Sequence, residues 1–116
     1  MTGTLPPRRR ETRADQAAVR ERGLARLRDL VWQTIGERPA RVWLVGSMAR
    51  GDWVKSSDID LAIALDTPDR VAVLGRLALA IEESPIPYFV DLVDLAETDE
   101  DFRARLLSEG IEWQRP

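Results

Sequence analysis

The sequence predicts an α+β fold of the layered type, in which a small mixed β-sheet carries helices mainly on one face. Hydrophobic patterns along the chain follow the order helix, strand, strand, helix, strand, helix, which is typical of a sheet covered by helices. The 116 residues suffice for one domain with one core, and 44% apolar residues argue against a chain that is disordered throughout. We therefore expect a single domain over residues 12–116, preceded by a flexible arginine-rich arm at residues 1–11.

The first predicted helix covers residues 12–35. One apolar stripe at spacings of three and four supports it, formed by Leu24, Leu27, Val31 and Ile35. Gly23 lies inside this stretch and costs roughly 1 kcal/mol relative to alanine, so an interruption is expected there. Gly36 is a plausible end of the helix. A short buried strand follows over residues 41–45 and ends at Gly46.

The second predicted strand covers residues 58–65 and alternates cleanly. One face carries Ile59, Leu61, Ile63 and Leu65, and the other carries Asp58, Asp60, Ala62 and Ala64. The apolar face suits a core. The small alanines on the other face are expected to leave room for a ligand beside the two acids.

The rest of the chain predicts a helix, a third strand and a last helix. Thr67 is expected to cap the first of these helices, which runs to about Glu83. The third strand covers residues 88–95 and places Asp91 and Asp94 on opposite faces. After the last helix, residues 111–113 could form an edge strand or a docked tail.

The charge and residue-type composition narrows the possible functions. Residues 1–41 carry ten arginines and five acids, whereas residues 42–116 carry seven basic and fifteen acidic residues. The acidic body argues against broad nucleic-acid binding, and the basic segment could be a docking arm or a solvated tail. With no cysteine and no histidine, disulfides, thiolate zinc sites and imidazole catalysis are excluded, and any metal must rest on oxygen ligands. Neither a transmembrane run nor a secretory signal is recognisable, which fits a cytoplasmic protein.

Three acids are candidates for a metal site. Asp58 and Asp60 lie two apart on a strand, on the same face, with Cα atoms roughly 6–7 Å apart. Carboxylates in this arrangement can hold one or two Mg²⁺ ions. Asp91 lies at the centre of an apolar strand, where an unpaired charge is costly. If that strand neighbours the second one, three carboxylates converge, and Asp91 could also assist removal of a proton from an attacking hydroxyl. Each acid alone could equally be a strand entry or a satisfied edge residue.

A phosphate-binding turn is predicted just before these acids. Gly46 allows close approach of the backbone, the amides that follow can point at an anion, and the Ser47 hydroxyl adds a donor. Arg50 and Lys55 lie in the same connection and could contact phosphate. The simpler alternatives are an ordinary turn at Gly46 and an ion pair between Arg50 and Asp52.

The motifs resemble those of a known family. The run Gly-Ser-Met-Ala-Arg-Gly at residues 46–51, followed by Ser-Asp-Ile-Asp-Leu at residues 57–61, resembles the nucleotidyltransferase signature of the DNA polymerase β superfamily. The short MNT type of bacteria and archaea is the most similar, and residues 90–95 and 109–111 also fit it. The resemblance covers residues 40–113, and it implies a polymerase-β-like nucleotidyltransferase fold with its core there.

The resemblance also implies roles and partners. Gly46 and Ser47 would bind the triphosphate of ATP, Asp58 and Asp60 would ligate two Mg²⁺ ions, and Asp91 would complete the metal site. Similar proteins are typically antitoxins that transfer AMP from ATP to a tyrosine hydroxyl of a HEPN-type ribonuclease toxin, which implies a hetero-oligomer. A large second domain that grips a polynucleotide or an aminoglycoside is not expected, which disfavours the roles of a template polymerase or a drug-modifying enzyme.

Two other functions stay open on the sequence. The chain could be a non-catalytic antitoxin that neutralises its toxin by binding alone. It could also transfer nucleotides to a small molecule or RNA together with a partner subunit. Trp53, in a polar loop, is expected to be exposed and to mark a contact surface.

Overall fold

The computed structural model describes residues 12–54 and 58–116. The predicted arm at residues 1–11 and the candidate Lys55 lie outside the described residues. In chain order the elements are α1 (Arg13–Ile35), β1 (Ala40–Val45), α2 (Ser47–Arg50), β2 (Ile59–Leu65), α3 (Arg70–Glu82), β3 (Val90–Asp94), the 3-10 helix η1 (Leu95–Glu97), α4 (Glu100–Ser108) and β4 (Ile111–Trp113). The predicted order of helices and strands is therefore confirmed, with residues 111–113 as a strand.

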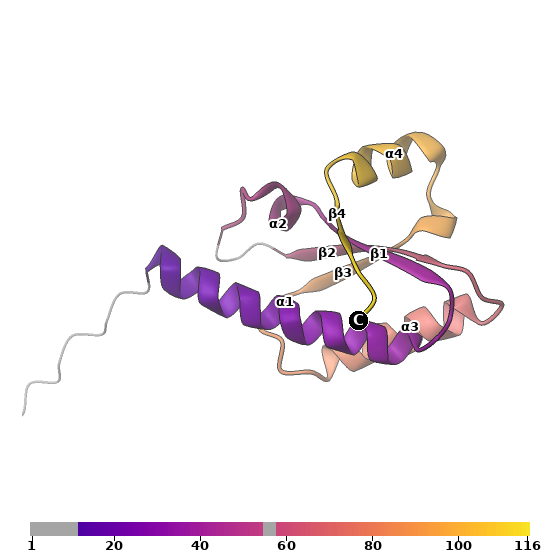
Figure 1. The fold of residues 1–116 in the computed structure, drawn as a ribbon, viewed down its shortest axis with the longest axis horizontal. Helices are drawn as coiled ribbons and strands as arrows, with labels where there is room; N and C mark the ends of the chain where they lie inside the picture. Colours follow the sequence, from indigo (N-terminus) through magenta and orange to yellow (C-terminus); the bar gives the residue numbers. More distant parts are fainter. Residues whose placement is uncertain (1–11, 55–57) are drawn as a thin grey trace, which may run out of the picture.

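The sheet is mixed, as predicted. Its four strands lie in the order β3-β2-β1-β4 (Figure 1). β1 pairs antiparallel with β2 and with β4, whereas β2 and β3 are parallel. The crossover through α3 makes the parallel pairing possible. β3 and β4 are the two edges.

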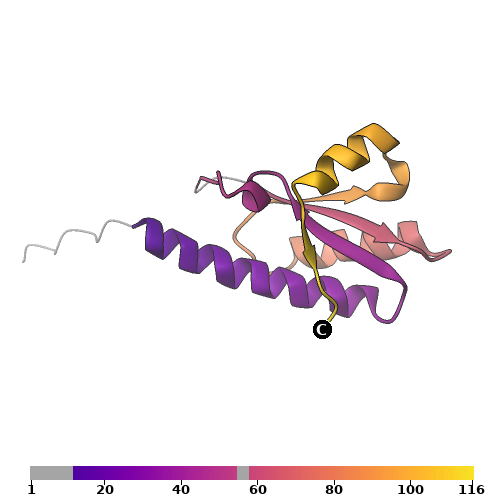
Figure 2. The same cartoon turned by 45° about the horizontal axis from the view of Figure 1, so that its top comes forward.

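The long helices α1 and α3 cover one face of the sheet, and the short helix α4 lies over the opposite face (Figures 1 and 2). The main core lies between the sheet and α1 and α3. Its fully buried members include Leu27, Val31, Ile35, Val42, Ile59, Leu61, Ile63, Val73 and Leu77. The predicted apolar stripe of α1 and the alternation of β2 both point into this core, so both are confirmed.

The opposite face of the sheet carries a smaller apolar cluster. It consists of Trp43, Val45, Ala62 and Leu95, with Leu106 and Leu107 of α4 packed against it. Ala62 is fully buried in this cluster. The expectation that the alanines of β2 leave space for a ligand is therefore wrong at Ala62, because Leu95 and α4 fold back over that part of the strand.

Two local predictions are also corrected. Gly23 does not interrupt α1, which is continuous from Arg13 to Ile35. A Cβ at position 23 would come within 3.1 Å of the Tyr88 ring, so glycine permits a close contact between α1 and the segment before β3. The cap of α3 is Asp69 rather than Thr67. Asp69 is held by Arg38, which donates to both of its carboxylate oxygens at 3.2 and 2.9 Å.

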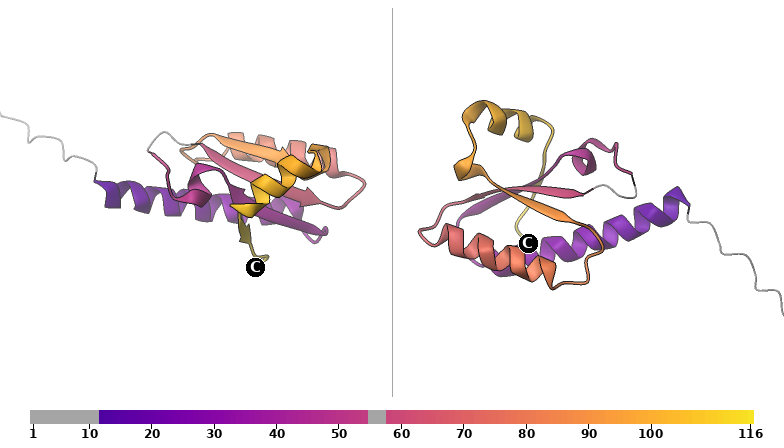
Figure 3. Two further views of the ribbon diagram at one scale, coloured as in Figure 1. Left: turned by 90° about the horizontal axis from the view of Figure 1, so that it is seen from above. Right: turned by 180° about the vertical axis from the view of Figure 1, so that it is seen from behind.

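The acid-bearing ends of β2 and β3 lie away from the turn that joins β1 to α1 (Figure 3). Among the described residues, no helix is long and apolar enough to span a membrane.

Candidate active site

The three candidate acids lie on two neighbouring strands. Asp58 and Asp60 lie at the start of β2, and Asp91 lies on the edge strand β3. The parallel register places Asp60 directly opposite Asp91, and the antiparallel register places Asp60 opposite Val45. Paired residues on neighbouring strands lie about 4.8 Å apart and point to the same face of the sheet. That face is the one that α1 and α3 leave uncovered. The condition on which the convergence of the three acids depends, that β3 neighbours β2, is therefore met.

Gly46 brings the predicted phosphate-binding turn against these acids. Its backbone has φ 73° and ψ −155°, a region that only glycine adopts readily. A Cβ built at this position would collide with Oδ2 of Asp60. Gly46 precedes α2, and its carbonyl accepts from the amides of Ala49 and Arg50, each at 3.1 Å. The turn after β1 and the acid on β2 are therefore in direct contact.

The Asp60 carboxyl is electrostatically coupled to its neighbours. Partial burial raises the pKa of Asp60 above its ordinary value, and the negative charges of Asp91 and Asp58 raise it further. The nearby Arg50 guanidinium acts in the opposite direction. A bound cation at this point would remove the repulsion between the acids.

The donor set matches a hard divalent cation, since it offers only carboxylate oxygens. Asp58 and Asp91 are exposed, whereas Asp60 is half-buried. In the present side-chain positions, however, no group of three acids over residues 12–54 and 58–116 could hold a metal ion. The backbone thus brings the acids together, while their side chains do not form a complete ligand shell.

Arg50 lies at the end of α2, close enough to Asp60 to affect its pKa. Its guanidinium pairs with Asp52 at 3.3 Å and with Glu109 at 3.4 Å. The pairing with Asp52 corresponds to the simpler sequence alternative, while Glu109 was not anticipated because it lies 59 positions away in sequence. Ser47 is half-buried at the first position of α2.

The two acids of β3, Asp91 and Asp94, have different surroundings. Asp91 is exposed at the sheet edge rather than enclosed in an apolar setting, because β3 has a neighbour on one side only. Asp94 accepts from the Arg70 Nε at 2.9 Å and from the Ala96 amide at 3.1 Å. Asp94 is thus a structural residue that caps η1.

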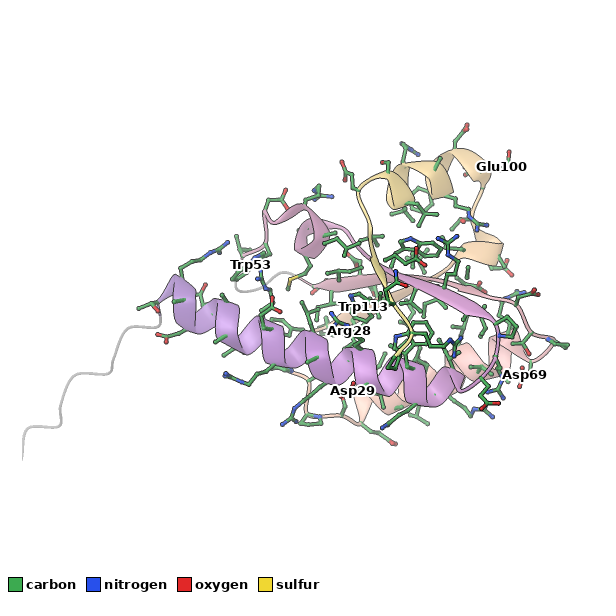
Figure 4. All side chains as sticks on the ribbon, viewed as in Figure 1. Arg28, Asp29, Trp53, Asp69, Glu100 and Trp113 are labelled. Atoms are coloured by element: carbon green, nitrogen blue, oxygen red, sulfur yellow. The ribbon has the colours of Figure 1, made fainter. Side chains whose placement is uncertain are left out.

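Trp53 contradicts the expectation of an exposed contact residue. Only 6% of it is exposed, and the guanidinium carbons of Arg13 and Arg20 lie 3.7 and 4.2 Å from its ring centroid. Figure 4 shows Trp53 beside the first turns of α1. The two arginines lie seven residues apart, which is two helical turns, so both face the same side of α1.

This fold and this arrangement of a glycine turn against paired acids define a nucleotidyltransferase of the polymerase β type. The chain belongs to the family described as "Polymerase beta, Nucleotidyltransferase", which matches residues 34–112.

Individual relatives agree with this assignment. The chain is 38% identical over 88 residues to "Probable protein adenylyltransferase MntA" of Haemophilus influenzae, a match that covers 76% of this chain and 75% of the relative. A solved structure described as a minimal nucleotidyltransferase is 29% identical, with a TM-score of 0.62, over 83% of this chain and 93% of that one. A toxin-antitoxin crystal structure with AMP-PNP shares the fold at 24% identity and a TM-score of 0.52, over 80% of this chain and 72% of that one.

Proposed function

We propose that this chain is a magnesium-dependent nucleotidyltransferase antitoxin, which transfers AMP from ATP to a tyrosine hydroxyl of a HEPN-type ribonuclease toxin. The observation that carries the proposal is the contact of Gly46 with Asp60, together with the register that places Asp91 beside Asp60. The relative described as a protein adenylyltransferase supports a protein acceptor. The resemblance of residues 46–51 and 57–61 to the MNT signature supports a toxin as that acceptor, and therefore a hetero-oligomer.

The triphosphate would bind at the turn after β1. Gly46 has no side chain, so a phosphate can approach the backbone there, and the Ser47 hydroxyl can donate to a phosphate oxygen. Arg50 would exchange its partners Asp52 and Glu109 for phosphate. Both ion pairs join exposed side chains, where water and salt screen the charges, so this exchange costs little. Lys55 remains a candidate for the same role.

Asp58, Asp60 and Asp91 would hold the magnesium, as one or two ions, after Asp58 and Asp91 turn toward Asp60. Bound Mg²⁺ would neutralise charge that develops on the phosphates. The attacking hydroxyl oxygen would bond to the α-phosphorus of ATP as the bond from that phosphorus to the bridging oxygen breaks, so that pyrophosphate leaves. Asp91 would accept the proton of the hydroxyl. Its exposed place on an edge strand leaves room for an acceptor side chain from another protein.

The decisive experiment follows label from ATP. The chain is incubated with ATP labelled in the α-phosphate, MgCl₂ and the protein encoded beside it. We expect label on a tyrosine of that protein, and a decrease of about 100-fold or more in the rate for Asp60→Asn. Asp66→Asn is the matched control, because it removes an exposed acid just beyond the opposite end of β2.

The other outcomes identify the alternatives. Neutralisation of the partner without ATP, unchanged in Asp60→Asn, would indicate an antitoxin that acts by binding alone. Label on RNA or on a small molecule would indicate a different acceptor. Either result would overturn the proposal.

A further inference from the structure

Trp53 lies in the connection from α2 to β2, outside the sheet, and is nevertheless 6% exposed. An aromatic side chain on such a connection is buried only if another element covers it. Here the covering element is the N-terminal part of α1 (Figure 4). Trp53 also belongs to the same buried cluster as Met48 of α2 and Leu24 of α1.

Two arginines of α1 make the contact. The guanidinium carbons of Arg13 and Arg20 lie 3.7 and 4.2 Å from the Trp53 ring centroid, within the range of cation–π attraction. Arg13 also donates from Nη1 to the Trp53 carbonyl at 3.2 Å. The backbone and the side chain of residue 53 are thus both bound to α1.

The Arg20 side chain is largely buried against Trp53. Its side chain is 19% exposed, and its Nε is buried without a hydrogen-bond partner among the described residues. Its Nη2 pairs with Glu21 at 3.2 Å, but that carboxylate is largely exposed. A buried donor without a partner is costly, so the position of Arg20 is best explained by stacking on the indole ring.

The tryptophan links this contact to the proposed nucleotide site. Residue 53 follows the Gly46 turn and α2, and it precedes Asp58 by five positions. A fixed Trp53 therefore restrains the chain directly after α2 and the phosphate-binding turn. The family match begins at residue 34, so Arg13 and Arg20 lie in a part of α1 that the family pattern does not include.

We propose that Arg13 and Arg20 are positioning residues for the nucleotide site. Through Trp53 they hold α2, and with it the turn at Gly46, in the arrangement that binds the triphosphate. The first turns of α1 are thus a functional part of the site and not only a cover for the core. This inference rests on the proposed nucleotidyltransferase function.

The test measures the affinity for AMP-PNP in the presence of MgCl₂ by calorimetry, and needs no acceptor. We expect Arg13→Ala/Arg20→Ala to bind about ten-fold more weakly, which corresponds to a binding-competent arrangement populated about a tenth of the time. The matched control is Arg22→Ala/Arg26→Ala, which removes the same charge from exposed positions of the same helix and should bind as the wild type does. Thermal midpoints are recorded so that all proteins are compared in the folded state.

A third variant separates geometry from charge. Arg13→Lys/Arg20→Lys keeps both charges but loses the planar groups that stack on the ring. Binding between that of the alanine variant and the wild type supports the stacking role, whereas full wild-type binding would overturn it. If the double alanine variant does not fold, Arg13→Ala alone decides, with about three-fold weaker binding expected.

The outcomes distinguish this inference from the function on which it rests. Equal affinity of the wild type and Arg13→Ala/Arg20→Ala would overturn the positioning role while the nucleotide site stands. Absence of AMP-PNP binding in the wild type would overturn the proposed function and, with it, this inference.

Discussion

At position 46 the absence of a side chain serves two purposes. The backbone at φ 73° and ψ −155° is strained for any other residue, and the space where a Cβ would lie is occupied by the Asp60 carboxylate. The other glycines from residue 12 onward that the structure describes lack one or both of these constraints. Gly51 also has a positive φ, of 80°, but nothing lies within 4 Å of a Cβ built there. At Gly46, therefore, both the backbone conformation and the nearby Asp60 carboxylate require a residue without a side chain.

Gly46→Ala is therefore expected to lower both stability and nucleotide affinity. The backbone conformation alone should cost about 1–3 kcal/mol of unfolding free energy. Displacement of Asp60 should weaken binding of AMP-PNP with MgCl₂ by about ten-fold or more. Urea unfolding and calorimetry measure the two effects separately.

Gly75→Ala is the matched control for this substitution. Gly75 lies in α3, is exposed, and has nothing within 4 Å of a Cβ built on it. Alanine should stabilise the helix there by about 0.5–1 kcal/mol and leave binding unchanged. Normal binding in Gly46→Ala would show that Asp60 does not need its present position.

At the scale of single elements, the start of α3 is tied to the end of α1. Arg38, in the loop after α1, forms a two-fold hydrogen-bonded pair with Asp69, and Thr67 donates to the same carboxylate at 2.6 Å. Together these bonds lower the pKa of Asp69 from its ordinary value of 3.8 to about 2, with the Arg38 hydrogen bonds as the largest cause. The tie therefore requires an ionised carboxylate.

This tie predicts a pH dependence with a definite sign. Because the pKa of Asp69 is lowered on folding, the stabilisation is fully present above pH 4 and is lost as the pH falls toward 2. Asp69→Asn should lower the urea midpoint at pH 7, and the difference from the wild type should shrink between pH 4 and pH 2. Asp66→Asn serves as control. A difference that stays constant down to pH 2 would show that the carboxylate charge is not what joins the two elements.

The α3 cap also shows which elements the sequence could predict and which it could not. The alternation of residues 59–65 predicted the two faces of β2 because each side chain's face depends only on its parity. The pairing of Asp69 at the start of α3 depends on Arg38, which lies 31 positions away, and the contact of Trp53 with α1 involves Arg13, 40 positions away. The burial of Ala62 has the same kind of cause, since Leu95 and α4 reach it only in the folded chain.

For the molecule as a whole, the acids and the glycine turn were predictable because strand order and register bring them together. The positions of the carboxylate oxygens were not, because exposed side chains such as Asp58 and Asp91 have several accessible rotamers. The sequence spacing of the glycine turn and the acids predicted where the site lies, but it did not predict whether the carboxylate oxygens are positioned to bind a metal ion.

The stabilisation of the folded chain by bound nucleotide and metal tests the whole site in one measurement. If AMP-PNP and Mg²⁺ bind to the folded chain only, a ligand concentration 100 times Kd should stabilise it by about 2.7 kcal/mol. For a domain of this size this corresponds to a rise in Tm of roughly 10 °C. AMP-PNP with EDTA should give a much smaller rise. Equal shifts with and without Mg²⁺ would show that binding does not require the metal, against the proposed role of the three acids.

The last strand has a consequence for synthesis of the chain. β4 covers the outer edge of β1, and Arg41 forms a two-fold pair with Glu112 across 71 positions of sequence. Until residues 111–113 have left the ribosome, β1 therefore presents unpaired amides and carbonyls to solvent. An open strand edge invites pairing with other chains. The nascent protein thus carries an open β1 edge until β4 is available, and this exposure ends when β4 pairs with β1.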